Sequence, residues 1–245
     1  MRSDMMIPTY PVEHWTTVLA EPNYQMQAAK TVTVNDRAAT RQAIITAVRR
    51  NGFEFIERSG WAAHKNKSDE MIDDWNYTKI AIHHAGRSFS CGPAALQMQE
   101  IQNLHMGNRK WSDIGYHYAT DCLGNIYEGR DIRFKGAHLD EYNTGVIGIV
   151  FLENLSEPED SHDRAGAILS ILKRIGLGRD IVVPSIQKEN IKKFIAILRQ
   201  AFSITTLGGH QEFPKQNSQE ARLCPGMHGI KLVKELRSWG GLSQP

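Results

Sequence analysis

The stretch Val146-Ile147-Gly148-Ile149-Val150-Phe151-Leu152 is a continuous apolar run that is rich in β-branched residues. Such a run is typical of a central strand that is covered on both faces of a sheet. Shorter runs predict further strands at 53–57, 78–83, 114–120, 125–128 and 204–207. Between them, apolar residues recur at helical spacing over 36–50, 94–106, 161–175, 187–202 and 229–239. Because strands alternate with helices, the sequence predicts an α/β fold with a central mixed β-sheet flanked by helices.

The beginning of the chain differs from the rest. Residues 1–52 start with a polar, proline-containing stretch and then include the helix predicted at 36–50, which Asn51-Gly52 is expected to end. A length of 245 residues is enough for one or two domains. We therefore expect a partly helical N-terminal extension at 1–52 and one catalytic or binding domain at 53–245.

The composition excludes several classes of protein. With 29 basic and 27 acidic residues, the net charge is only +2, which argues against generic binding of nucleic acid. No run of about 18 apolar residues is present, so we expect no membrane span. Residues 1–20 lack the apolar core of a signal peptide, so we expect synthesis in the cytoplasm and, if the protein is exported, a non-Sec route.

The three cysteines are Cys91, Cys122 and Cys224. An odd number of cysteines without a signal peptide argues against a disulfide framework. Each sulfur can therefore be a core residue, a reactive thiol or a metal ligand.

Histidines follow two of the predicted buried strands. His83 and His84 stand at the carboxyl end of one strand, where α/β sheets tend to present functional groups, and His210 follows another strand. With Cys224, two imidazoles and a thiolate would satisfy a catalytic zinc ion that keeps a fourth position for water. The spacing alone does not decide the matter, because His83 or His84 can equally be a hydrogen-bonded core histidine and Cys224 a buried small residue.

Short segments spread over residues 53–239 resemble the peptidoglycan recognition protein family and its zinc amidase relatives, the type 2 amidases. They are Ile56–Ala63, Ile80–Gly86, Ile101–Met106, Trp111–Tyr118, Ile126–Arg130, Gly136–His138, Tyr142-Asn143, Ile147–Ile149, Gly209-His210 and Cys224–Gly226, in the order of the family. The resemblance implies the fold of that family and Zn2+ held by His83, His210 and Cys224. It also implies the activity of an N-acetylmuramoyl-L-alanine amidase, which hydrolyses the amide between the lactyl group and L-alanine in peptidoglycan.

The same resemblance implies roles for other residues. Tyr116 stands at the position of the catalytic tyrosine, although a tyrosine at a strand end can also simply pack. Arg222 replaces the lysine or threonine of catalytic relatives, and as a permanent cation it would stabilise negative charge. Candidates for contact with substrate are His84, which alternatively hydrogen-bonds locally, and Arg109, His117, His138 and Asn143.

The chain also departs from the family pattern. Cys91 stands where animal members begin a short disulfide loop, but Gln97 occupies the partner position, so we expect no bridge and a protein made in a reducing cytosol. The loop from His210 to Cys224 is longer than is common in the family and is expected to reshape one wall of the cleft.

Relatives that only bind peptidoglycan typically lack the cysteine ligand, which this chain keeps. A zinc amidase is therefore the main prediction, and a non-catalytic peptidoglycan-binding module is the alternative. An amidase without a leader must reach the cell wall by another route, so we expect action in the periplasm or outside the producing cell. An antibacterial effector or a lysis enzyme fits that setting, and an effector would need an immunity protein as partner.

Overall fold

A computed structural model describes residues 36–86, 91–157, 181–218 and 223–245 of the chain. Its centre is a six-stranded sheet in the order β1-β4-β3-β5-β2-β6. The strands are β1 (Phe55–Ile56), β2 (Lys79–His84), β3 (Tyr118–Thr120), β4 (Ile126–Glu128), β5 (Val146–Phe151) and β6 (Thr206–Gly209). Only β3 and β4 pair in antiparallel fashion, and the other four pairs are parallel. The predicted mixed sheet is confirmed.

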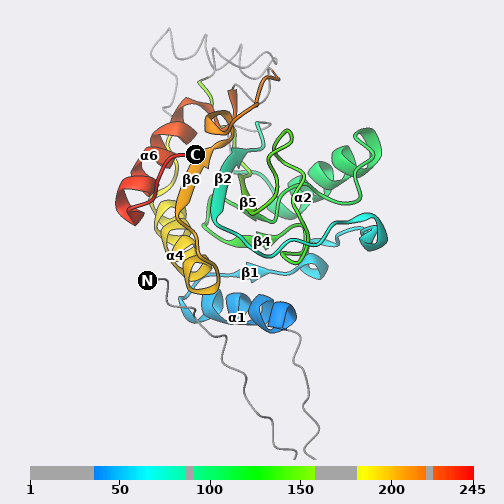
Figure 1. Ribbon diagram of the computed structural model, residues 1–245. Coiled ribbons are helices and arrows are strands. Elements are labelled where there is room, and N and C mark those ends of the chain that lie inside the picture. The colour runs from blue at the N-terminus through cyan, green and yellow to red at the C-terminus, as the bar shows by residue number, and fades with distance from the viewer. Residues whose placement is uncertain (1–35, 87–90, 158–180, 219–222) are drawn as a thin grey trace, which may run out of the picture.

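Helices cover both faces of the sheet (Figure 1). Three of them, α1 (Asp36–Arg50), α4 (Ser185–Ala201) and α6 (Gly226–Gly240), share the main apolar core with the sheet, while α2 (Ala94–Asn103) packs on the other face. β5 lies between β2 and β3 with every residue buried, as its sequence predicts. Successive residues of β5 point to opposite faces of the sheet, since Ile149 lies in the main core and Val150 packs with α2.

Short helical turns complete the described chain. They are η1 (Arg58–Trp61), η2 (Ser68–Glu70), the π-helical turn η3 (Leu104–Asn108) that continues α2, and η5 (His210–Glu212). Among the described residues, none of the helices combines the length and the apolar character that a membrane span requires. The helix predicted at 161–175 lies outside the described residues.

The N-terminal helix α1 packs as part of the main core. Its residues Ile44, Ile45 and Val48 are buried there. Arg41 of α1 also reaches Glu128 of β4, with Nε 2.5 Å from Oε1 and Nη2 2.6 Å from Oε2. The domain boundary at residue 52 stays a prediction, but helix α1 folds against the sheet that carries the site.

The strand predicted at 114–120 is shorter than expected, because β3 begins only at Tyr118. Backbone bonds to β5 continue at His117, whose N–H donates to the Gly148 carbonyl at 3.0 Å, but side chains bind the backbone of Ile114 and Gly115. Arg130 Nε donates to the carbonyl of Ile114 at 2.8 Å, and the Gly115 N–H donates to His105 Nδ1 at 3.0 Å. A Cβ atom on Gly115 would lie 2.2 Å from the carbonyl oxygen of Ala137, so this segment passes close beneath another loop.

Cys91 and Cys122 form a disulfide with their Cα atoms 5.7 Å apart, and the expectation of no bridge was therefore wrong. The odd number of cysteines and the glutamine at position 97 do not report which cysteines the fold brings together. The fold brings the loop after β2 against the turn between β3 and β4, which are distant in sequence. Among the described residues, the one free cysteine is Cys224.

We expect a Cys91→Ser variant to lose about 3–4 kcal/mol of unfolding free energy, since the bridge closes a separation of 31 residues and restricts the unfolded chain. Cys91 is exposed, so the serine itself adds little further cost. Urea denaturation of wild type and variant, each with and without reductant, measures the effect. Reductant should weaken the wild type alone, and a wild-type midpoint that ignores reductant would contradict the bridge.

Candidate metal centre

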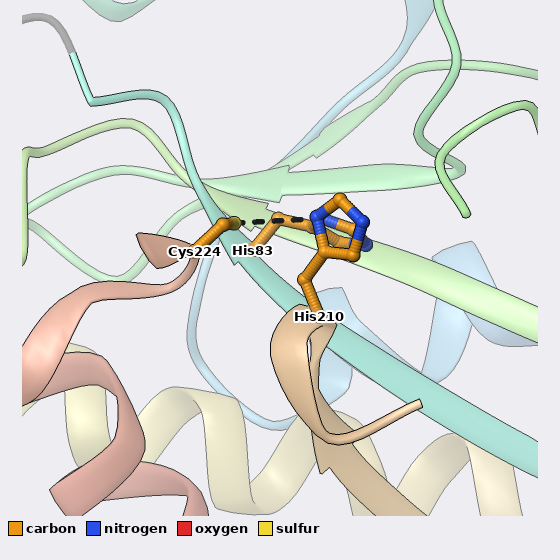
Figure 2. Close-up of side chains that lie close together, drawn as sticks. All are labelled: His83, His210 and Cys224. Carbon is orange, nitrogen blue, oxygen red and sulfur yellow. Dashed lines mark hydrogen bonds between the residues drawn. The ribbon is translucent and has the colours of Figure 1, made fainter. Parts of the chain in front are cut away.

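Three side chains from separate segments meet at the carboxyl edge of β2 and β6. The two strands are parallel neighbours with Ile82 opposite Gly209, so the next residues, His83 and His210, lie side by side with ring centroids 4.6 Å apart. Cys224 enters from the segment that precedes α6, and its Sγ is 3.7 Å from His83 Nδ1 (Figure 2). One ligand atom from each residue lies within 4.8 Å of the others. Two imidazoles and a thiol at this separation can hold a divalent transition metal.

The turn that presents Cys224 is held by the backbone of Leu155. Gly226 has φ +81°, and a Cβ atom there would lie 2.4 Å from the Leu155 carbonyl, so only glycine fits. The Leu155 N–H donates to His84 Nδ1 at 3.0 Å, and its carbonyl accepts from the His228 N–H at 3.0 Å. The structure thus gives His84 a local hydrogen bond that supports the turn, the alternative considered for it.

A second anchor fixes the turn that carries His210. Glu212 of η5 accepts the Gly209 N–H at 2.9 Å and is bound by both terminal nitrogens of Arg237 on α6, at 2.5 and 2.9 Å. Both charged side chains are only 12% exposed. Such a two-pronged pair of ionised groups is strong and directional, so it holds η5 against α6.

Burial favours the neutral form of His83 and His138. Burial lowers the pKa of His83 well below its usual value, and the neighbouring His210 and His138 lower it further. The pKa of His138 is also well lowered, by burial and then by His117. A neutral imidazole has the lone pair that a metal ligand needs, so burial leaves His83 in the form that can bind a metal.

His138 and Asn143, both predicted to contact substrate, are used inside the protein. His138 is 6% exposed, and its Nδ1 lies 3.1 Å from His83 Nε2. Asn143 Oδ1 accepts the N–H groups of His138 and Leu139 at 2.8 and 2.9 Å. Their hydrogen bonds support the candidate metal centre rather than face a groove.

His117 is also part of the interior. It is fully buried, its Nδ1 accepts the Gly148 N–H at 3.0 Å, and its Nε2 donates to the Phe134 carbonyl at 3.0 Å. Burial lowers the pKa of His117 to about 4. With both ring nitrogens bonded internally, His117 does not fit the predicted contact with substrate.

A row of rings leads from the metal centre to the surface. Tyr116 lies 4.9 Å from His83 between ring centroids, His105 lies 5.5 Å from Tyr116, and Trp111 lies 4.6 Å from His105. The guanidinium of Arg109 is 5.0 Å above the Trp111 ring and is exposed. Tyr116 is at the inner end of this row, beside His83, and Arg109 is at its exposed end. Both residues therefore lie on one side of the centre. Arg222 lies outside the described residues.

Sequence reasoning missed Gln216, whose side chain contacts the centre. Gln216 Oε1 is 2.9 Å from His210 Nε2, and the residue is 7% exposed. It belongs to the long loop between His210 and Cys224, where no periodic pattern marks a single glutamine. The length of that loop was the only available signal.

Comparisons with known proteins agree with this architecture. A family model described as N-acetylmuramoyl-L-alanine amidase matches residues 77–227. Peptidoglycan-recognition protein SC2 of Drosophila melanogaster is 38% identical over 106 residues, which cover 42% of this chain and 56% of that protein. Peptidoglycan-recognition protein SD of the same organism is 38% identical over 121 residues, 49% of this chain and 65% of that protein. The chain thus spans less than two thirds of these relatives.

Solved structures show the same fold. The crystal structure of Drosophila peptidoglycan recognition protein SD has a TM-score of 0.58 at 23% identity and covers 78% of this chain and 97% of its own. Peptidoglycan recognition protein LE, solved in complex with tracheal cytotoxin, has a TM-score of 0.58 at 24% identity and covers 77% and 95%. At this level of identity, the likeness establishes the fold alone.

Proposed function

Because this chain belongs to the N-acetylmuramoyl-L-alanine amidase family, we propose that it is a zinc-dependent amidase that cleaves the lactyl–L-alanine amide of peptidoglycan. The observation that carries the proposal is the meeting of His83, His210 and Cys224, whose ligand atoms lie within 4.8 Å of one another. Two imidazoles and one thiolate suit Zn2+ and leave a fourth position for water or substrate. When bound, zinc supplies Lewis-acid polarisation of the scissile carbonyl and a water that can attack near neutral pH.

The residues of the chain supply orientation and charge stabilisation. Tyr116, beside His83, is proposed to donate its hydroxyl hydrogen to the oxyanion that develops on the scissile carbonyl. Arg109 at the exposed end of the row is proposed to bind the stem peptide. Arg222 precedes Cys224 by two residues, and its role as an electrostatic stabiliser stays a prediction.

A non-catalytic peptidoglycan-binding module is the second candidate. It is favoured by the similarity to recognition proteins, including one solved in complex with tracheal cytotoxin and a human one in complex with glycosamyl muramyl pentapeptide. The three candidate ligands support the amidase, because binding of a muropeptide does not require a site for an activated water.

The proposed setting lies outside the reducing cytosol. The disulfide between Cys91 and Cys122 supports this, since such bonds persist in oxidising compartments. We propose action in the periplasm or outside the producing cell, as an antibacterial effector or lysis enzyme. An effector of this kind would require an immunity protein in the cell that makes it.

Mass spectrometry of purified sacculi incubated with the protein tests the proposal. We expect free stem peptides that begin with L-alanine, no product after treatment with a chelator, and recovery when zinc is added back. A pull-down in the same samples shows whether the protein binds the sacculi. Bound protein with unchanged sacculi at saturating zinc would refute the amidase and support the recognition module.

A further inference from the structure

Each histidine of the metal centre uses one ring nitrogen in a hydrogen bond to another side chain. His83 Nε2 contacts His138, and His210 Nε2 contacts Gln216. In a neutral imidazole one nitrogen carries the hydrogen and the other carries the lone pair, so the partner of one nitrogen decides what the other can do. The two partners can therefore determine which nitrogen faces a metal.

The partner of His83 is fixed by a backbone carbonyl. His138 Nε2 lies 3.3 Å from the carbonyl oxygen of Val146, which only accepts, so this nitrogen carries the hydrogen. His138 Nδ1 is then an acceptor, and His83 Nε2 must donate to it across 3.1 Å. The lone pair of His83 is left on Nδ1, the nitrogen 3.7 Å from Cys224 Sγ.

The fold makes room for the ring of His138 in particular. A Cβ atom on Gly136 or on Gly148 would lie 2.5 Å from its Cδ2 atom, so side chains at either position would displace the ring. Asn143 holds the backbone on which the ring stands, through the N–H groups of His138 and Leu139. The two glycines thus leave space for the imidazole, and the Asn143 amide fixes the backbone that carries it.

The partner of His210 has a fixed orientation as well. Gln216 Nε2 donates to the carbonyls of Asp140 and Pro214 at 3.0 and 2.8 Å, and Gln216 Oε1 accepts the Asp140 N–H at 2.9 Å. A flipped amide would place its NH2 group against that N–H, so the oxygen faces His210. His210 Nε2 must then donate across 2.9 Å, and its lone pair is on Nδ1.

We propose that His138 and Gln216 are positioning residues that fix the tautomers of the two ligand histidines, so that both present Nδ1 to the metal. The inference rests on the proposed metal site and adds the device that arranges it before the metal arrives. Both residues meet at the loop 138–143, since Gln216 bonds the backbone of Asp140 and His138 opens that loop. Partners of this kind typically change metal affinity 10- to 100-fold when removed.

The tautomers can be read in the metal-free, full-length protein. Two-bond 1H–15N correlation spectra of 15N-labelled protein report which ring nitrogen is protonated, and His83→Gln and His210→Gln variants assign the signals. We expect His83 and His210 both to carry the hydrogen on Nε2. In His138→Phe, a ring of similar shape without an acceptor, we expect His83 to lose this single tautomer while His210 keeps it.

Zinc affinity, measured by competition with a chelator, gives the second readout. We expect His138→Phe and Gln216→Leu each to bind zinc about 10- to 100-fold more weakly, and His138→Gln to recover affinity because its amide oxygen can accept from His83. Gln102→Leu is the matched control for Gln216→Leu. Gln102 is also a buried glutamine, and its amide bonds the backbone of His64 and donates to Asp113 Oδ1 at 2.7 Å. Because none of these bonds involves His83, His210 or Cys224, stability should fall and zinc affinity should not.

Two results would overturn the inference: hydrogen on Nδ1 of either ligand histidine in the wild type, or unchanged tautomers and affinity in folded His138→Phe and Gln216→Leu. If one variant fails to fold, the wild-type spectrum and the other variant still decide. Intact sacculi from a zinc-loaded protein with the expected tautomers would refute the amidase alone. The two proposals can therefore fail separately.

Discussion

The Cys224→Ser variant is expected to lose zinc and to release stem peptides from sacculi at least about 1000-fold more slowly than the wild type. Cys224 is 8% exposed and its Sγ faces His83 Nδ1, so serine fits the same volume. A serine hydroxyl does not ionise at neutral pH, however, and the site would keep only two imidazoles. A metal contributes several kcal/mol to such a transition state, and each 1.36 kcal/mol is a factor of ten in rate.

The matched control for this prediction is Cys91→Ser, assayed at a temperature where circular dichroism shows it folded. It also replaces a cysteine by serine, but in the disulfide rather than at the centre. Zinc content is measured on both variants after dialysis, beside the rate of peptide release. A Cys224→Ser protein that retains stoichiometric zinc and wild-type turnover would rule out the proposed ligand set.

Much of the fold could be predicted because it follows from periodic patterns. The apolar run at 146–152 indicated a strand covered on both faces, and the observed β5 is buried throughout. The α1 helix runs over the predicted residues 36–50. The expected meeting of His83 and His210 also follows from the sheet, since parallel neighbouring strands end at one edge. In each case, local sequence determines the element and general topology determines its place.

The residues that sequence reasoning misplaced depend on contacts between distant segments. His117 and His138 were predicted to contact substrate because they resemble positions that line the substrate groove in relatives. Their surroundings are nevertheless set by Gly148 of β5, whose N–H is bound by His117 and whose missing side chain makes room for His138. The pairing of Cys91 with Cys122 is a tertiary fact of the same kind. No local pattern reports which buried polar groups will satisfy one another.

The Tyr116→Phe variant is expected to lower kcat by about 100- to 1000-fold, or about 2.7–4 kcal/mol, while KM and zinc content stay at wild-type values. The ring of Tyr116 is only partly exposed and packs against the apolar residues between α2 and the sheet, 4.9 Å from the ring of His83. Phenylalanine preserves this packing and removes only the hydroxyl. An effect confined to kcat would therefore locate the role of that hydroxyl in the transition state, because an interaction with the ground state would also raise KM.

Tyr127→Phe is the matched control. Tyr127 lies on β4, and its hydroxyl donates to Asp121 Oδ2 at 3.3 Å, away from the metal centre. The variant therefore removes the same atom, and we expect no loss of turnover. Steady-state release of L-alanine-terminated peptides from a soluble muropeptide separates kcat from KM for both variants. If Tyr116→Phe matched Tyr127→Phe in kcat, Tyr116 would be a packing residue that precedes β3. The oxyanion would then have to be stabilised by the metal and by residues such as Arg222.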